Sequence, residues 1–195
     1  MSDTSPLAVE EYRALRATIR ERGTVRLIVT VLTFVAWSAL AVSVQALLVT
    51  LPVMTLVPLM LLAIGFEVVF AAHVGVERIG RYLYVHHESA NHRTAPCWEH
   101  AISQLGPRAN SGSGLDPLFA VGFITAAMLN LVPVLMLIMT TDVEPALPGG
   151  LPLWPALFAL AHVLFIARVV GAKRFAARQR AVDTELFQTA AGPRA

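Results

Sequence analysis

Glu67 is the residue whose position in this sequence most strongly suggests chemistry. It lies in the apolar stretch VPLMLLAIGFEVVFAAHVG, about eight residues from its polar end, or ~12 Å along a helix. A charged side chain at that depth in a bilayer costs on the order of 2.5–3.5 kcal/mol unless it is paired or protonated, so an intramembrane carboxylate suggests an ion or proton site. Ala63 and Ala71, one helical turn to either side, would let another helix approach closely. We therefore expect Glu67 to point into a helix bundle.

Two further polar residues in apolar stretches could meet this carboxylate. His162 lies six residues before Arg168, about 9 Å from the same polar boundary, so the depths favour a Glu67–His162 pair. A hydrogen-bonded core histidine is the alternative. Asn130 lies three residues before Pro133, which removes an amide from its helix, so a hydrogen bond within or between helices explains it better than ligand binding. The candidates for binding an ion or a proton are thus Glu67, His162 and Asn130.

A second group of candidate ligands lies in the segment VHHESANHRTAPCWEH. Its members carry imidazole or thiol groups, which bind zinc and similar ions, and they are His86, His92, Cys97 and His100. Their spacing matches no standard site, because Cys97-x-x-His100 lacks a matching half. A polar loop whose histidines titrate near neutral pH is the simpler interpretation. His73, near the end of the apolar stretch, is explained by an interaction with Glu77 four residues later.

Motifs of the common enzyme classes do not occur. The sequence contains no Gly-rich phosphate loop, nucleophile elbow, His-Glu-x-x-His or paired-cysteine motif. Cys97 is the only cysteine, so no intrachain disulfide can form. We expect the protein to be a non-enzyme rather than an enzyme, and no cofactor is firmly implied.

Four apolar spans must position these residues, at about 26–49, 57–75, 117–140 and 151–170. The chain of 195 residues is 56% hydrophobic and 14% charged, whereas a soluble domain has about 25% charged residues. Each span is close to the roughly 20 residues that cross a bilayer core of about 30 Å. Because unpaired backbone groups cannot face lipid, we expect an all-α integral membrane four-helix bundle within residues 25–172, with cytoplasmic amphipathic helical extensions.

All 15 Lys and Arg residues fall on one side of this four-span pattern. Five precede the first span, four lie between the second and third, and six lie at or after the end of the fourth. Basic residues favour the cytoplasmic side of a membrane. We therefore expect a multi-pass protein of the plasma (inner) membrane, with both termini and loop 76–116 in the cytoplasm. Because the basic residues lie at membrane edges, nucleic-acid binding is not indicated.

The cytoplasmic segments are predicted to be partly helical. Residues 1–24 predict an amphipathic helix that begins at Ser5-Pro6 and ends at Gly23. It would lie either on the membrane surface or on the cytoplasmic end of the bundle. Pro96 begins a second short helix with Trp98 on its apolar face, and residues 173–195 form a polar helical tail.

Three functional interpretations stay open. The first is ion- or proton-linked transport through a buried Glu/His site, which in a four-helix protein would require a homo-oligomer. The second is a membrane scaffold or accessory subunit that binds a membrane partner protein through its cytoplasmic helices. The third is a metal-dependent membrane enzyme that uses the His/Cys loop. The lipid bilayer is the partner common to all three, and the first is favoured over the second.

Overall fold

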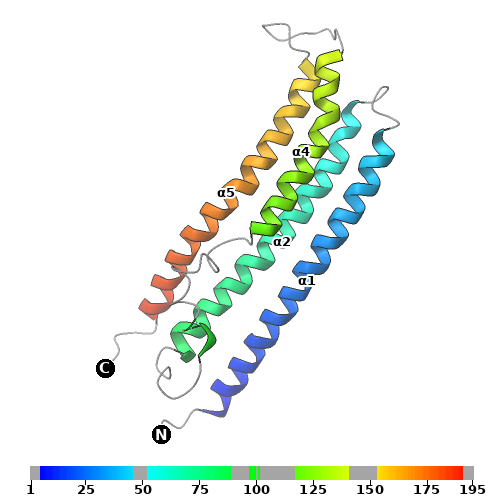
Figure 1. The fold of residues 1–195 in the computed structure, drawn as a ribbon. Helices are drawn as coiled ribbons and strands as arrows, with labels where there is room; N and C mark the ends of the chain where they lie inside the picture. Colours follow the sequence, from blue (N-terminus) through cyan, green and yellow to red (C-terminus); the bar gives the residue numbers. More distant parts are fainter. Residues whose placement is uncertain are drawn as a thin grey trace. The chain divides into compact units, whose positions relative to one another are not determined.

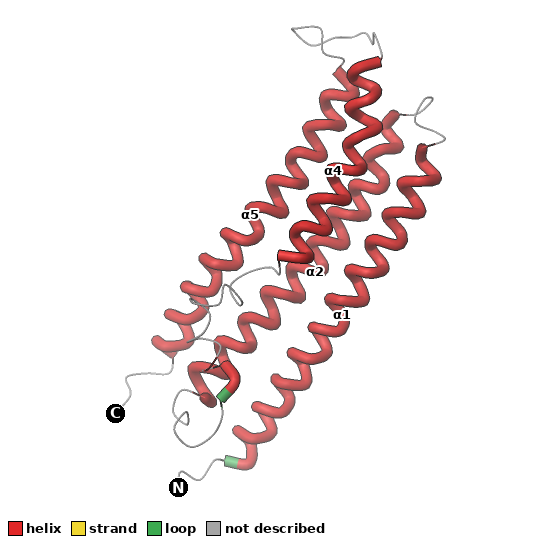
Figure 2. The backbone as a smooth tube through the Cα atoms, viewed as in Figure 1, coloured by secondary structure: helices red, strands yellow, loops and turns green. Residues whose placement is uncertain are grey.

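The computed structural model describes residues 5–45, 52–88, 97–99, 101, 117–140 and 153–190. In these residues all regular structure is helical, and four helices are long and apolar enough to cross a membrane (Figure 1). They are α1 (Pro6–Gln45), α2 (Leu56–Leu83), α4 (Pro117–Thr140) and α5 (Leu153–Ala190). A 3-10 turn, η1 (Pro52–Thr55), precedes α2, and a π-helical turn, η2 (Tyr84–Glu88), continues it. Figure 2 shows the described elements in red, as helix. The predicted all-α class is confirmed for the described residues.

Two of these helices continue well into the charged segments of the chain. α1 passes through Gly23 without a break, so the predicted stop at this residue is wrong. A glycine inside a helix costs roughly 1 kcal/mol relative to alanine, and the Arg, Glu and Ala residues before it are good enough helix formers to offset that cost. α5 likewise runs through its Lys/Arg-rich segment as far as Ala190. Which part of each helix crosses the membrane stays a prediction.

α4 begins at Pro117, as the sequence predicts, because proline has no amide that the first turn of a helix would leave unbonded. Pro133 lies inside this helix and withdraws the amide that would bond the carbonyl of Leu129.

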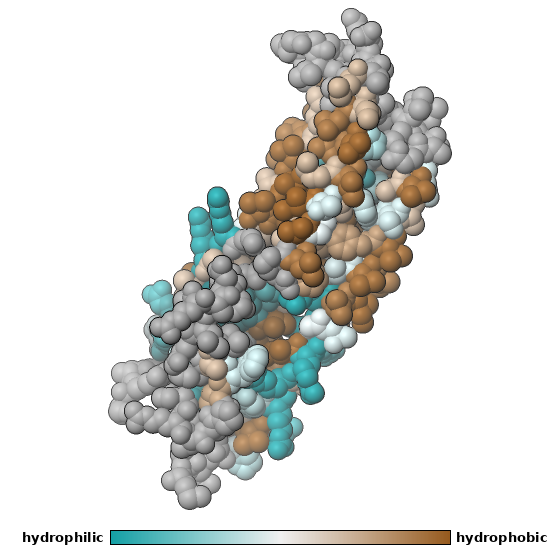
Figure 3. Space-filling model, in the orientation of Figure 1, coloured by the Kyte–Doolittle hydropathy of each residue, from teal (hydrophilic) through white to brown (hydrophobic). Residues whose placement is uncertain are grey.

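The helices divide between two compact units. Unit 1 comprises Met1–Leu27, Phe70–Leu115 and Lys173–Ala195, and unit 2 comprises Ile28–Val69 and Asp116–Ala172. α1, α2 and α5 contribute residues to both units, whereas α4 belongs to unit 2 alone. Figure 3 shows mostly apolar side chains on the described helices of unit 2 and many polar side chains on those of unit 1. Unit 2 therefore suits apolar surroundings, and unit 1 suits polar surroundings.

Aromatic side chains form much of the core of unit 2. Phe66 and Phe123 are fully buried, and their ring centroids lie 5.4 Å apart in an edge-to-face arrangement. Phe165 meets Phe66 at 6.0 Å in the same way, a geometry that the quadrupoles of the rings favour. Gly65, next to Phe66, lies directly against the side chain of Thr33, so a Cβ at this position would overlap it. The absence of a side chain at Gly65 is thus what lets α1 and α2 approach here.

Candidate functional site

A hydrogen-bonded polar group lies inside unit 2 and joins α4 to α5. Asn130 Nδ2 lies 2.8 Å from His162 Nε2 and donates to the carbonyl oxygen of Thr55 at 3.1 Å. His162 Nδ1 lies 2.7 Å from the carbonyl oxygen of Phe158. A neutral imidazole with its proton on Nδ1 satisfies both contacts, because Nδ1 then donates and Nε2 accepts. Asn130 and His162 thus form the structural hydrogen bonds that were the alternative to ligand binding.

Glu67 lies elsewhere, on the surface of unit 2. Arg168 Nη2 donates to Glu67 Oε2 at 2.8 Å, and the two side chains are 42% and 51% exposed. The predictions that Glu67 points into the bundle and pairs with His162 are therefore wrong. The inward face of this part of α2 is set by large residues such as Phe66 and Val69, both fully buried, and Glu67 is rotated about 100° from Phe66. The small residues Ala63 and Ala71 had indicated that the face bearing Glu67 points inward.

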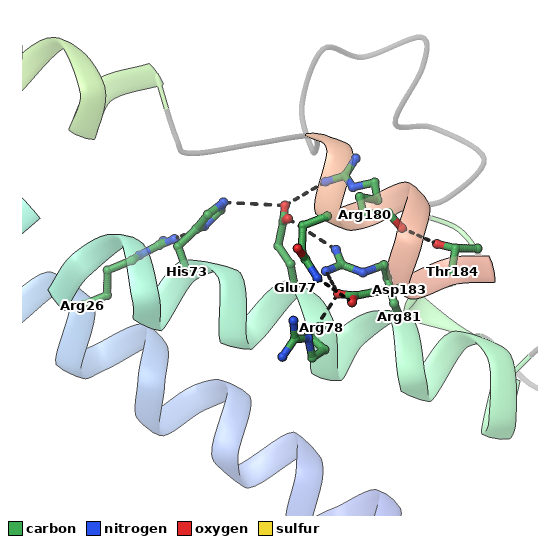
Figure 4. Close-up of polar contacts among 9 residues, drawn as sticks. Arg26, His73, Glu77, Arg78, Arg81, Arg180, Asp183 and Thr184 are labelled. Carbon is green, nitrogen blue, oxygen red and sulfur yellow. Dashed lines mark hydrogen bonds and ion pairs between the residues drawn. The ribbon is translucent and has the colours of Figure 1, made fainter. Parts of the chain in front are cut away.

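His73 and Arg26 form the first of the polar contacts in unit 1. His73 Nε2 lies 3.6 Å from Glu77 Oε1, which confirms the predicted interaction across one helical turn. Arg26 Nη1 donates to His73 Nδ1 at 3.0 Å, so α1 is joined to α2 through this imidazole (Figure 4).

A network of ion pairs continues from Glu77 and joins α2 to α5 (Figure 4). Glu77 accepts from Arg180 at 2.7 Å and lies 3.4 Å from Arg81 Nη1. Arg81 Nη2 in turn donates to Asp183 Oδ2 at 2.7 Å, and Arg78 Nε donates to the same oxygen at 3.2 Å. Charges this deeply buried require close pairing, and the network provides it by alternating carboxylates with guanidinium groups.

Asp183 is the most buried carboxylate of this network, with 5% of its side chain exposed. Burial alone would raise its pKa, but hydrogen bonds from Arg81, Gln179 and Arg78 outweigh that effect and hold the pKa of Asp183 below its ordinary value. The carboxylate is therefore ionised whenever the network is intact at neutral pH.

A second network holds the segment around Trp98 against α1. Arg16 donates to Glu88 Oε1 from Nη2 and to Glu99 Oε1 from Nη1, both at 2.6 Å. The amide of Glu99 donates to Glu88 Oε2 at 2.8 Å, and the Tyr12 hydroxyl donates to Glu88 Oε1 at 3.2 Å. Glu88 is buried, whereas Trp98 is 65% exposed. The N-terminal part of α1 thus contacts the end of α2 and the Trp98 segment within unit 1.

The proposed metal ligands are only partly described. His92 and His100 lie outside the described residues. His86 stacks on Tyr82 with ring centroids 4.5 Å apart, and burial raises the pKa of the Cys97 thiol. Within the described ranges, no group of three or more His, Cys, Asp or Glu side chains could hold a metal ion.

Apart from Glu77, the residues of the ion-pair networks were not identified from the sequence. Glu77 and Arg81 are separated by four residues, as are Gln179 and Asp183, and this spacing was a usable signal for contacts within a helix. No comparable signal links Arg16 to a carboxylate 72 residues away. Comparisons of the chain with protein-family models, with curated proteins and with solved structures find no match.

Proposed function

We propose that unit 2 is the membrane-embedded part of a four-span plasma (inner) membrane protein, with unit 1 and both termini in the cytoplasm. Residues 153–172 of α5 belong to unit 2 and would extend about 30 Å at 1.5 Å per residue, which is about the thickness of a hydrocarbon core. Arg168 is the only Lys or Arg of this unit. The remaining basic residues all belong to unit 1, as the preference of basic residues for the cytoplasmic side requires.

This placement brings Glu67 closer to the membrane edge than its sequence context suggests. Glu67 lies two residues before the end of the α2 segment of unit 2, and Arg168 lies four residues before the end of the α5 segment. Both are then within roughly 6 Å of the boundary along their helices. Charged side chains at that level can reach the headgroups, so an ion pair there carries a much smaller cost than one at the centre of the bilayer.

We infer that the protein is a membrane scaffold or accessory subunit, whose cytoplasmic unit holds a surface for a partner protein. The observation that carries this inference is the Arg16–Glu88–Glu99 network, which fixes both the position and the backbone of the segment bearing the exposed Trp98. Buried polar networks of this kind specify one geometry rather than adding much stability. A tryptophan presented on a fixed support is typical of the residues that dominate protein interfaces.

A photo-crosslinking amino acid at residue 98, in the full chain expressed in cells, tests the scaffold. We expect one defined adduct from position 98, and we expect it to disappear with Arg16→Gln, which releases the supporting network. The matched control is the same amino acid at Leu7, an even more exposed apolar position of α1 that contributes to neither network. Equal adducts from both positions, or an adduct at 98 that is insensitive to Arg16→Gln, would contradict the proposal.

Ion- or proton-linked transport is the second candidate, and the Glu67–Arg168 contact favours it. Both groups are exposed enough to be reached by a proton or a cation that competes with the ion pair. In a four-helix protein such a pathway would require a homo-oligomer. Flux into vesicles containing the purified chain should disappear with Glu67→Gln and persist with Glu10→Gln, which removes an exposed carboxylate of α1. Flux that survives Glu67→Gln would end this candidate.

The metal-dependent enzyme remains the third proposal. Metal analysis of the purified protein, before and after replacement of His92 and Cys97, tests it. Metal bound by the unaltered chain and lost from the variant would support it.

A further inference from the structure

Apart from Arg13, which is exposed and lies 3.9 Å from the equally exposed Glu10, the described arginines of unit 1 fall into two classes. The first class is paired with carboxylate or imidazole groups and comprises Arg16, Arg26, Arg78, Arg81 and Arg180. The second class is exposed and forms no ion pair with another described residue. It comprises Arg20, Arg22, Arg174 and Arg178. The first class is needed to hold unit 1 together, whereas the second is available to an external anion.

The unpaired arginines lie close to the limit of unit 1 along their helices. The α5 segment of this unit begins at Lys173, and its α1 segment ends at Leu27. At 1.5 Å per residue, all four arginines lie within roughly 12 Å of those limits. If unit 2 occupies the hydrocarbon core, this interval coincides with the headgroup region, which adds about 5–8 Å on each side, and long arginine side chains extend across the remaining distance.

The carboxylates of the same interval leave this surface predominantly basic. Glu77 is enclosed in the ion-pair network and cannot compensate the exposed arginines. Glu21, between Arg20 and Arg22, is the one exposed carboxylate here among the described residues. The other exposed carboxylates that the structure describes in unit 1, Glu10, Glu11 and Glu185, lie further along the helices.

Arg174 and Arg178 make the strongest part of this basic surface. They are four residues apart on α5 and therefore lie on the same face, one turn apart. Like charges at this spacing destabilise a helix by a few tenths of a kcal/mol, and an anion between them removes that repulsion. Guanidinium groups bind phosphate oxygens through paired hydrogen bonds. Phe175, exposed on the adjacent part of the surface, adds an apolar group beside them.

We propose that the Arg174–Arg178 face of α5 binds the phosphate groups of anionic phospholipids in the cytoplasmic leaflet, with Arg20 and Arg22 adding basic groups on two different sides of α1. The inference rests on the proposed membrane placement of unit 2, and it adds a ligand class that neither the scaffold nor the transport interpretation supplies.

Native mass spectrometry of the full chain, released from micelles containing phosphatidylglycerol and phosphatidylcholine, tests this proposal. We expect the unaltered chain to retain phosphatidylglycerol in preference. A basic side chain near an anionic surface contributes about 1 kcal/mol, so Arg174→Gln and Arg178→Gln should each weaken that retention roughly fivefold, and together roughly 30-fold. Arg13→Gln is the matched control, because Arg13 is an exposed arginine of α1 further from the unit limit. Circular dichroism of each variant establishes that the helices are intact.

Several outcomes would overturn the inference. Equal retention of the two lipids would do so, and so would an equal loss with Arg13→Gln, which would indicate a general effect of net charge. Displacement of phosphatidylglycerol by equimolar inorganic phosphate would identify a site for a soluble anion instead. Retention of neither lipid would contradict the membrane placement itself, so failure of the lipid site and failure of that placement give different results.

Discussion

Replacement of Asp183 should destabilise unit 1 more than replacement of any other charged residue of α5. The Asp183 side chain is 5% exposed and that of its main partner Arg81 is 11% exposed, with 2.7 Å between them. Removing one member of a buried pair costs about 3–5 kcal/mol. Arg81 retains Glu77 at 3.4 Å, and the half-exposed Arg78 adds less than about 1 kcal/mol. We therefore expect Asp183→Ala to lower the free energy of unfolding of unit 1 by about 3 kcal/mol.

Asp183→Asn separates charge from hydrogen bonding. The amide keeps one oxygen that can accept from Arg81, so the loss should be smaller, about 1–2 kcal/mol. Cys97, the only cysteine, belongs to unit 1. Labelling of its thiol along a denaturant series therefore reports the opening of that unit. Glu185→Gln, which removes an exposed carboxylate from the same helix, is the control.

The effect of Asp183 should also depend on pH in one direction. Its pKa in the folded protein lies below the ordinary value, which is about 3.9. The stabilisation is therefore fully present above that value and is lost as the pH falls through the lowered pKa of the folded state. The difference between the unaltered chain and Asp183→Ala should persist at neutral pH and shrink only in acid. An Asp183→Ala variant no less stable than Glu185→Gln would refute the network as we describe it.

Two further predictions concern glycine positions and the polar group of unit 2. Gly65→Ala should destabilise the chain, because the added Cβ would overlap a neighbouring side chain. Gly23→Ala should stabilise it by about 0.5–1 kcal/mol, because no atom lies within 4 Å of the added Cβ. Thermal unfolding of the two variants measures the two changes in stability, and changes of the same sign would contradict the packing. Asn130→Ala and His162→Ala should each lower the free energy of unfolding by about 1–3 kcal/mol. A double-mutant cycle should give a coupling energy of at least ~0.6 kcal/mol between them. Strictly additive effects would mean that the two side chains do not interact.

The sequence predicts the helices well because their cause is local. Uninterrupted apolar runs and the Asp116-Pro117 pair identify the long helices and the first residue of α4. Gly23 misled because a single unfavourable residue was given more weight than the helix formers that precede it. The polar helical tail predicted after residue 173 is found as the continuation of α5 to Ala190, because its Arg, Ala and Gln residues are good helix formers.

The candidate site is predicted less well because its contacts are not local. Depth along the helices predicted a Glu67–His162 pair, whereas His162 contacts Asn130, because depth along a helix does not determine rotation around it. The rotation of Glu67 depends on the packing of Phe66 against rings from other helices. In the sequence Arg168 indicated only the membrane orientation and the polar boundary, although its side chain pairs with Glu67. Ranking bulky side chains above small ones when assigning the inward face would have corrected the orientation.

The π-helical turn at the end of α2 has a consequence for how this helix serves two neighbours. In an uninterrupted α-helix, Glu88 would lie within about 20° of both Glu77 and Arg81, and would therefore face α5. Each residue of a π-turn rotates the chain less than an α-helical residue does, so the five residues Tyr84–Glu88 shift the phase by roughly a quarter of a turn. That shift aims the Glu88 carboxylate at Arg16 of α1. That shift is close to the roughly 100° that one α-helical residue contributes, so deleting one residue from the turn should restore a continuous α-helix and still leave the Glu88 carboxylate directed at Arg16.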